Sequence, residues 1–268
     1  MKLTVLVDNF TYIDQYYHGE PAAAYYLELE DKRILFDTGY SEIVLSNAEK
    51  MGIDLSKLTH IVFSHGHDDH TRGFKFLADK IDLANVEVIA HPACFLPKYS
   101  GDLYIGAPYS LQEMQAKTNF KPLAESYALT DKLIYLGQIP RTNDYENKEP
   151  IGSYEQDGKR EADYLLDDTA LAYRTNEGLF IITGCSHSGI CNIIEYAKKV
   201  CGEERICGVL GGFHIFEDDM RLAKTVEYLE KCNLQKLYPA HCVSLIAKAK
   251  MMAKLPVVEV GVGMQLDI

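Results

Sequence analysis

The sequence predicts an α/β protein in which two β-sheets pack face to face and helices cover the outside. Strand-like segments alternate with helical segments in both halves of the chain. The 268 residues are 47% apolar and 25% charged, which is a globular balance and a length that can bury a sizeable core. We therefore expect one domain that spans residues 1–268.

Each element follows from local patterns of apolar residues and turn formers. Residues 24–30 and 33–39 are compatible with a hairpin, and residues 41–51 have the spacing of one amphipathic helix that ends at Gly52. Further strands are expected at residues 3–8, 60–65, 86–92, 132–137, 169–174, 178–184, 205–212 and 235–241. Further helices are expected at residues 73–77, 190–200, 220–231 and 244–252.

Two segments lack this periodicity. Residues 97–123 are rich in Pro, Gly, Tyr and Ser, and we expect a surface loop or lid there because long segments of this kind are often functional. Its Lys98, Tyr99, Tyr104 and Tyr109 either close over a planar or phosphorylated substrate or simply pack. Residues 141–163 are expected to form a polar loop.

The charge balance argues against nucleic acid as a partner. The chain has 27 basic and 39 acidic side chains, a formal net charge of −12, and lacks the basic character that phosphate-backbone binding requires. No segment approaches the roughly 20 apolar residues of a membrane span, and the N-terminal segment has no secretory pattern. The seven cysteines form no CxxC pair, which favours a reducing compartment. We expect a cytoplasmic protein with a small-molecule substrate, and the sequence carries no signal for an oligomeric state.

A cluster of histidines follows the strand expected at residues 60–65. Residues 64–70 read SHGHDDH and contain the pattern HxHxDH. Imidazoles at alternate positions of an extended loop converge on one cation, and the Asp-His pair that follows can reach a second cation. Imidazole and carboxylate suit Zn, Fe and Mn. The pattern therefore predicts a site for one or two metal ions, in preference to an exposed histidine-rich loop.

Three more histidines stand at the ends of expected strands. His187, His214 and His241 end the segments GLFIITGCSH, ICGVLGGFH and QKLYPAH. Catalytic residues on open α/β scaffolds gather beyond the C-terminal ends of strands. One such histidine is as often structural as functional, but four strands that end in histidine are hard to explain by packing. We expect these histidines to join the metal site.

The pattern HxHxDH with distant single histidines resembles the metallo-β-lactamase superfamily. The sequence is most similar to the subgroup named for the archaeal dihydropterin and ribofuranosyl-aminobenzene phosphate synthase. The matching segments are VLVDN (5–9), HG (18–19), ILFDTG (34–39), FSHGHDDHTRG (63–73), AHP (90–92), GQIPR (137–141), DDTAL (167–171), GCSHSGICNI (184–193), GGFH (211–214) and PAHC (239–242). The resemblance implies an αβ/βα four-layer sandwich with the metals at one edge.

The resemblance also implies roles for single residues. The ligands of one metal would be His65, His67 and His187, and those of the other Asp69, His70 and His241. Asp37 of the DTG turn resembles the carboxylate that hydrogen-bonds near the histidines, with a plain turn residue as the alternative. Zinc is the expected cofactor, with iron or manganese as alternatives.

Three positions depart from the family pattern. Many members place a metal-bridging Asp at the end of the strand VLGGFH, where this chain has His214. Either His214 or water takes that place, or the second metal is weak or absent. Arg72 replaces a common Gly and would narrow or charge the mouth of the site. Val243-Ser244 replaces the Thr-Gly expected after His241.

Other residues near the strand ends are candidates for the substrate pocket. Ser186 and Ser188 precede a helix, and capping of that helix is favoured over binding of an anion. His91, which precedes Pro92, either lines the pocket or belongs to a turn.

These features predict a metallo-hydrolase that uses a metal-activated water on a small substrate, phosphorylated or pterin-like. Asp69 would orient the water, and His214 would stabilise a developing anion or donate a proton. The subgroup's transferase reaction, which joins a pterin to a ribofuranosyl-aminobenzene phosphate, is the first alternative. An iron-dependent redox protein is disfavoured because diiron members usually have Glu in the place of His67. A sensor that holds a metal without turnover is the remaining alternative.

Overall fold

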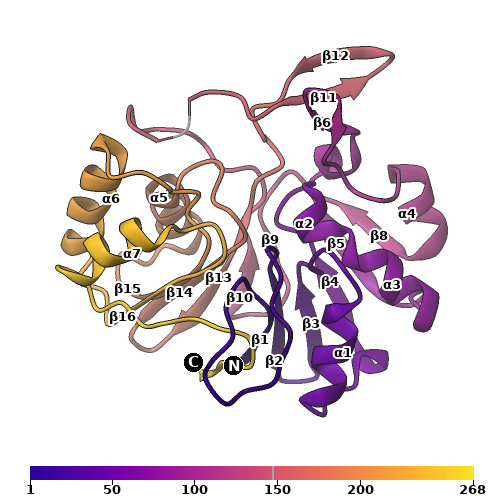
Figure 1. The fold of residues 1–268 in the computed structure, drawn as a ribbon, viewed down its shortest axis with the longest axis horizontal. Coiled ribbons are helices and arrows are strands. Elements are labelled where there is room, and N and C mark those ends of the chain that lie inside the picture. The colour runs from indigo at the N-terminus through magenta and orange to yellow at the C-terminus, as the bar shows by residue number, and fades with distance from the viewer. Residues whose placement is uncertain (147) are drawn as a thin grey trace. The chain divides into compact units, whose positions relative to one another are not determined.

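The computed structural model describes residues 1–146 and 148–268 (Figure 1). The chain divides into two compact units. The first unit comprises Met1–Ala124, Pro150–Asp167 and Gly261–Ile268, and the second comprises Glu125–Glu149 and Asp168–Val260. Each unit has its own sheet, helices and apolar core, and the expectation of a single domain stays a prediction.

A seven-stranded sheet forms the centre of the first unit, in the order β17-β1-β2-β3-β4-β5-β8. Its strands are β1 (Lys2–Val7), β2 (Ala24–Leu29), β3 (Lys32–Phe36), β4 (His60–Val62), β5 (Glu87–Ala90), β8 (Asn119–Pro122) and β17 (Gln265–Asp267). The pairs β17–β1, β1–β2 and β2–β3 are antiparallel, whereas the pairs β3–β4, β4–β5 and β5–β8 are parallel. The loops that follow β3, β4 and β5 therefore leave the sheet at one edge.

Helices pack on this sheet through the apolar faces that their sequences predict. They are α1 (Ile43–Lys50), α3 (Gly73–Lys80) and α4 (Leu111–Lys117), with the single turn α2 (Asp68–Thr71) and the 3-10 helices η1 (Leu55–Lys57) and η2 (Pro92–Phe95). Val44 of α1 and Phe74 of α3 lie in one buried cluster with Leu35 and Val88 of the sheet. Phe74 also meets Phe63 edge to face at 6.0 Å. These contacts fix the helices beside the loop that follows β4.

A small four-stranded sheet, β12-β11-β6-β7, corrects two expectations. Its strands are β6 (Lys98–Ser100), β7 (Leu103–Tyr104), β11 (Ser153–Gln156) and β12 (Lys159–Ala162). Residues 97–123, expected as an irregular loop, thus contain β6, β7, α4 and β8. Residues 141–163, expected as a polar loop, contain the β11–β12 hairpin. The hairpin is exposed and charged, so it lacks the apolar alternation that marks a half-buried strand.

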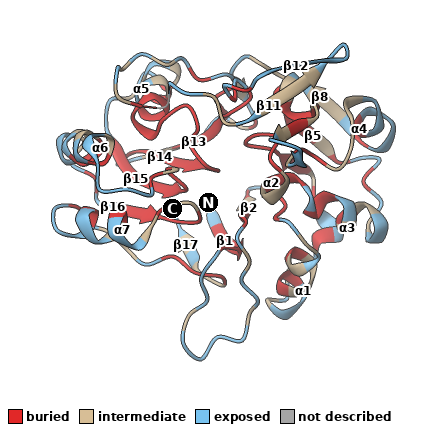
Figure 2. Ribbon diagram, turned by 45° about the horizontal axis from the view of Figure 1, so that its top comes forward, coloured by how far each residue is buried: buried red, intermediate tan, exposed pale blue. Residues whose placement is uncertain are grey.

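The second unit is built on a six-stranded sheet, in the order β16-β15-β14-β13-β10-β9. Its strands are β9 (Tyr127–Ala128), β10 (Leu133–Tyr135), β13 (Ala170–Thr175), β14 (Gly178–Thr183), β15 (Ile206–Gly211) and β16 (Lys236–Pro239). Strands β14, β15 and β16 are parallel, so the loops that follow them also share one edge. Figure 2 shows these strands buried along most of their length.

Three helices pack on the sheet of the second unit, namely α5 (Ile190–Cys201), α6 (Met220–Lys231) and α7 (Leu245–Met252). Ile194, Leu222 and Met251, one from each helix, lie in a buried cluster with Val209 of β15. Helix α5 ends at Gly202, whose left-handed φ of 62° terminates the helix without steric cost. All seven cysteines are free thiols. Among the described residues, every helix is too short or too polar to cross a membrane.

Candidate metal centre

In the first unit, candidate site residues follow three neighbouring parallel strands at the edge where these strands end. Asp37 follows β3, residues 64–70 follow β4, and His91 follows β5. Residues 64–70 are called the histidine loop below. Within this loop His65, His67 and Asp69 each offer one ligand atom, and these three atoms lie within 4.8 Å of one another. A single cation can therefore be reached by all three side chains.

His67 of this loop is held as a neutral ring. Burial lowers the pKa of His67 to about 4, so its ring is uncharged at neutral pH and keeps a lone pair for a metal. The rings of His65 and His67 lie 4.7 Å apart between centroids, and those of His65 and His70 lie 4.3 Å apart. The rings of the three histidines therefore lie close together beside a neutral His67.

Asp37 orients two of these rings. Its carboxylate is fully buried and accepts hydrogen bonds from the Ser64 backbone N–H, the Ser64 hydroxyl and His70 Nδ1, each at 2.7 Å. Because the Ser64 proton points to Asp37, the Ser64 oxygen accepts from His65 Nδ1 at 2.9 Å. Both rings thus carry their proton on Nδ1 and the lone pair on Nε2, as metal-ligating histidines do.

A second contact tests whether the loop fits a metal ion. The Nε2 atom of His70, which carries the lone pair, lies 3.5 Å from the Asp69 Oδ2 atom. Two electron-pair donors that face each other in this way repel unless a proton or a metal ion lies between them. The donor set of the histidine loop, imidazole nitrogen with carboxylate oxygen, therefore fits a divalent transition metal.

The second unit presents its own histidines at the ends of β14, β15 and β16. His187 and His241 are buried, and His214 is half-buried. The rings of His187 and His214 lie 4.6 Å apart. Left-handed φ angles of 56°, 50° and 48° occur at Ser186, His214 and His241. Such angles are costly for residues other than glycine and persist at functional strand ends, where the surrounding structure enforces them.

These features agree with the comparisons to known proteins. A family model described as the Metallo-beta-lactamase superfamily matches residues 19–198. The chain belongs to this superfamily. Members bind divalent metal ions and are typically metal-dependent hydrolases.

Three relatives span nearly the whole chain. The uncharacterized protein MJ0448 of Methanocaldococcus jannaschii is 37% identical over 93% of both chains. The 7,8-dihydropterin-6-methyl-4-(beta-D-ribofuranosyl)-aminobenzene-5'-phosphate synthase of the same organism is 27% identical, covering 94% of this chain and 90% of the synthase. The crystal structure of Tm1679, a metal-dependent hydrolase of the beta-lactamase superfamily, is 30% identical and covers 100% of this chain and 99% of its own, with a TM-score of 0.84. The metallo-β-lactamase-like fold and the resemblance to the synthase subgroup are thereby confirmed.

Each of the two ligand sets expected for this superfamily draws on both units. The first unit brings His65, His67, Asp69 and His70 together in the histidine loop, with Asp37 behind them. The second unit brings His187 and His214 side by side and places His241 after β16, the strand next to β15.

Lys98 and Asp167 support the histidine loop, and sequence reasoning did not assign them to it. The Lys98 ammonium is buried between Asp163 Oδ2 at 2.6 Å and Asp167 Oδ1 at 3.1 Å. Burial alone would lower the pKa of Lys98, but the two carboxylates outweigh it and raise the pKa, so the charge is kept. The other oxygen of Asp167 accepts from the Gly66 N–H at 2.8 Å. Lys98 therefore belongs to the support of the loop, whereas we had expected it to face substrate or simply pack.

Gly66 is required where it stands in the loop. A Cβ atom at this position would lie 2.0 Å from the Cys94 carbonyl oxygen, a separation that no side chain can adopt. The backbone of the histidine loop thus packs directly against η2. The only sequence signal for Asp167 was its place in the family-like segment DDTAL.

The serines of the segment GCSHSGI hold the loop before α5. The Ser186 hydroxyl donates to the Gly212 carbonyl oxygen at 2.6 Å, and the Ser188 backbone N–H donates to Asp168 at 2.9 Å, which the Ser188 hydroxyl also contacts. Neither serine caps the helix, because the N-cap residue is Gly189 with a φ of 98°. The expectation of serine capping is therefore wrong.

Glu146 caps α5 from a distant part of the second unit. Its two carboxylate oxygens accept from the Cys191 and Asn192 backbone N–H groups, both at 2.9 Å. A Cβ atom at Gly189 would lie 2.4 Å from this carboxylate, which explains the glycine. The helix N-terminus is thus occupied by an anionic side chain of the protein itself, and it does not provide the anion site that was the alternative for Ser186 and Ser188.

His91 belongs to a turn and also borders a cavity, while its place in a substrate pocket stays a prediction. Its Nδ1 accepts from the Ala93 N–H at 3.1 Å and so caps η2. The same side chain lines a cavity of about 400 Å³ together with Tyr154, Glu161 and Tyr164. Because Nδ1 accepts, the proton of the neutral ring lies on Nε2.

Proposed function

We propose that this member of the superfamily is a metal-dependent hydrolase of a small substrate, phosphorylated or pterin-like. The observation that carries the proposal is the histidine loop, in which the ligand atoms of His65, His67 and Asp69 lie within 4.8 Å of one another. The hydrogen bonds that begin at Asp37 add support. They keep the proton of His65 and His70 on Nδ1, so the Nε2 atom of each ring has a lone pair that a metal can accept. The similarity to Tm1679, a metal-dependent hydrolase of the beta-lactamase superfamily, is consistent with this class of reaction.

The proposed ligands form two groups that follow the family pattern. They are His65, His67 and His187 for one ion, and Asp69, His70 and His241 for a second. Zinc is the proposed metal, with iron or manganese as alternatives, since imidazole and carboxylate suit all three. The proposal requires that His187 and His241 of the second unit share ions with the histidine loop.

The chemistry follows from the side chains. A divalent ion supplies Lewis acidity, which lowers the pKa of water toward neutrality so that hydroxide is available for attack. Asp69 keeps a second carboxylate oxygen with which to orient the attacking water and take its proton. His214, half-buried next to His187, donates a proton to the leaving group or stabilises the anion that develops on it.

A metal measurement with a matched pair of histidine variants tests the proposal. His67→Ala removes a proposed ligand, whereas His60→Ala removes a histidine at the other end of β4, where it pairs with Thr59 and Glu87. We expect His67→Ala to lose metal and hydrolysis of a panel of phosphomonoesters, phosphodiesters, lactones and thioesters. We expect His60→Ala to keep both. Full metal content and full activity in His67→Ala would overturn the assignment.

A second candidate is a transferase that joins a pterin to a ribofuranosyl-aminobenzene phosphate. It is favoured by the 27% identity to a synthase named for that product over nearly the full length of both chains. Incubation of the metal-loaded protein with a pyrophosphate-activated pterin and the aminobenzene phosphate decides between the two reactions. A joined product with release of pyrophosphate supports the transferase, and hydrolysis without joining supports the hydrolase.

A further inference from the structure

A cavity of about 490 Å³ lies in the first unit next to the histidine loop. The loop forms one side of it, because Asp68 lines the cavity and its N–H donates to the Ile105 carbonyl oxygen at 2.9 Å. His67 pairs with Gly106 in an isolated β-bridge, and Gly106 also lines the cavity. A molecule bound there would therefore lie beside the proposed metal ligands.

Two cations stand at this cavity. Arg72 ends α2 and Lys75 lies three residues later in α3, so both project on the same side of the helical segment. The Arg72 guanidinium lies over the Tyr40 ring, 4.3 Å from its centroid, which holds the flexible side chain in place. Among the described residues, no carboxylate forms an ion pair with Arg72 or Lys75. Arg72 also interacts electrostatically with Asp68 of the same cavity, without an ion-pair contact, so an outside anion can still approach both cations.

Tyrosine rings form the walls of the cavity, and their positions are fixed by neighbours. Tyr109 packs edge to face on Phe74 with ring centroids 5.8 Å apart. Tyr104 donates its hydroxyl proton to the Ala107 carbonyl oxygen at 2.6 Å. Together with Tyr40, these rings enclose a space suited to a planar ring, because aromatic pairs stack or meet edge to face at defined separations.

We propose that this cavity binds an aromatic molecule that carries a phosphate or carboxylate group. The ring lies between Tyr104 and Tyr109, and the anionic group pairs with Arg72 and Lys75. Asp68 accepts a hydrogen bond from an amino or hydroxyl substituent at the end of the ring that faces the histidine loop. The inference rests on the proposed function in one respect, since it makes the cavity the place where the non-reacting end of the substrate binds.

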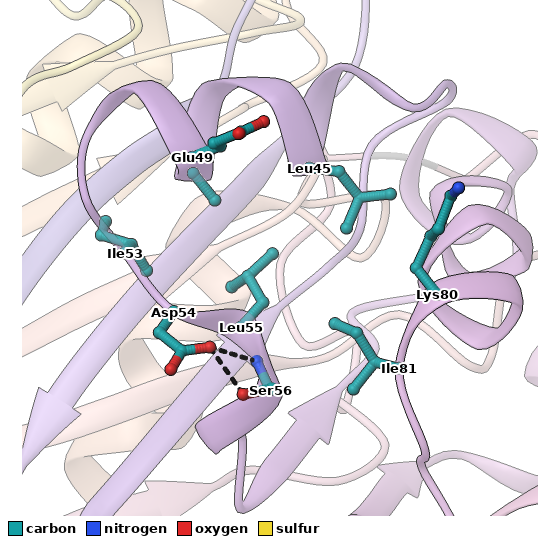
Figure 3. Close-up of a pocket in the computed structure, with 9 residues that line it drawn as sticks. Leu45, Glu49, Ile53, Asp54, Leu55, Ser56, Lys80 and Ile81 are labelled. Carbon is teal, nitrogen blue, oxygen red and sulfur yellow. Dashed lines mark hydrogen bonds between the residues drawn. The ribbon is translucent and has the colours of Figure 1, made fainter.

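A second cavity on the same unit shows the contrast and supplies the control (Figure 3). It has a volume of about 390 Å³ and lies between α1 and α3. Its lining is aliphatic, with Leu45 and Ile81 among the side chains, and its charged residues are Lys80, Glu49 and Asp54. With two carboxylates, one lysine and no aromatic ring, it does not suit an aromatic anion. Lys80 is therefore the matched control for Lys75, because both belong to α3.

Binding of phenylphosphonate to the protein as purified tests the proposal by titration calorimetry. Its carbon–phosphorus bond resists hydrolysis, so binding is measured whether or not the protein is a hydrolase. We expect the double variant Arg72→Met, Lys75→Met to raise the Kd about tenfold or more, since charge-assisted hydrogen bonds are lost. Lys80→Met should leave the Kd unchanged. Equal binding by the wild type and the double variant would overturn the proposal.

Three further ligands and one further variant make the test more specific. Inorganic phosphate and cyclohexylphosphonate lack the aromatic ring, so both should bind more weakly than phenylphosphonate, and benzoate should compete with it. Tyr109→Leu, which keeps the charges, should weaken phenylphosphonate but not inorganic phosphate. Tight binding of inorganic phosphate that Tyr109→Leu does not affect would contradict an aromatic site. Failure of the metal-loaded wild-type protein to hydrolyse any substrate of the panel would refute the proposed function alone, because phenylphosphonate binding does not depend on turnover.

Discussion

Replacement of Lys98 by methionine removes the buried cation that holds two carboxylates beside the histidine loop. The side chains of Lys98, Asp163 and Asp167 are only 2%, 5% and 1% exposed, so solvent does not screen their charges. Loss of one partner of a buried pair leaves an uncompensated buried charge and typically costs about 3–5 kcal/mol. Here two carboxylates lose their shared partner, which places the expected loss in unfolding free energy in the upper part of that range.

The same variant should weaken metal binding. Asp167 holds the Gly66 N–H with its other oxygen, and Gly66 lies between the two histidines of the HxH pair. Disturbed support of metal ligands commonly lowers metal affinity about 10- to 100-fold. Chelator competition measures this loss, and urea unfolding measures the loss of stability. Lys159→Met, at an exposed position of β12, is the control and should change neither quantity.

The triple variant Lys98→Met, Asp163→Asn, Asp167→Asn separates charge from packing. Because it removes all three charges together, it should be less destabilised than Lys98→Met alone. The reasoning would be refuted if Lys98→Met lowered the unfolding free energy by less than about 1 kcal/mol. It would also be refuted if the destabilisation of the triple variant equalled the sum of the three single changes.

The pH dependence of this cluster has a defined sign. Lys98 holds the pKa of Asp167 below its ordinary value of 3.8 although burial opposes the shift, so the stabilisation by Asp167 is present above pH 3.8 and is lost as pH falls through the lowered pKa. In Lys98→Met the carboxylates are buried without a cation, which raises their pKa above 3.8. The folded variant therefore binds protons before the unfolded chain does, and its stability increases as pH falls toward 3.8. The stability gap between wild type and variant should therefore be largest near neutral pH and should narrow in acid. A gap that is constant from pH 7 to pH 4 would contradict this account.

Three other substitutions test single contacts. Asp37→Asn leaves one oxygen to accept from three donors and frees the His70 ring to rotate. Metal affinity measured by chelator competition should therefore fall about 10-fold or more, and an unchanged affinity would contradict the role of the carboxylate. Glu146→Gln removes the charge that caps α5 and should cost about 1–2 kcal/mol in urea unfolding, whereas exposed Glu149→Gln should cost nothing measurable. Gly66→Ala forces a Cβ atom against the Cys94 carbonyl oxygen and should lower the unfolding free energy by about 1–3 kcal/mol in thermal unfolding. A variant as stable as the wild type would show that the backbone of the loop can shift to accommodate the methyl group.

The sequence predicted most elements of the two large sheets because their residues are patterned by burial. Helix α5 was expected at residues 190–200 and runs from Ile190 to Cys201, since its apolar face and Gly202 mark both the packing and the end. The β11–β12 hairpin was missed because its residues are mostly exposed and its cross-strand pair Glu155–Arg160 is charged. Helix α4 was missed for a related reason, since only Met114 is buried, although Ser110 and Glu113 form a capping box that could have signalled its start.

The candidate site also has a part that the sequence predicted and a part that it did not. The histidine loop could be predicted because its ligands lie within six residues and their spacing is itself the signal. Asp37 was expected from the family pattern, but Asp167 was not assigned to the loop, because it lies 101 residues from Gly66. Glu146, which caps α5, was not predicted for the same reason, since it lies 45 residues from Cys191. Contacts of that separation are set by how the chain folds, and a single Asp or Glu in a polar segment carries no local mark of them.

Anomalous diffraction at the zinc, iron and manganese absorption edges, on crystals of the metal-loaded protein, tests the central claim most directly. The account predicts a peak at one of these edges within about 2.0–2.2 Å of a ring nitrogen of both His65 and His67. A loaded crystal whose peaks all lie away from these two side chains would contradict it.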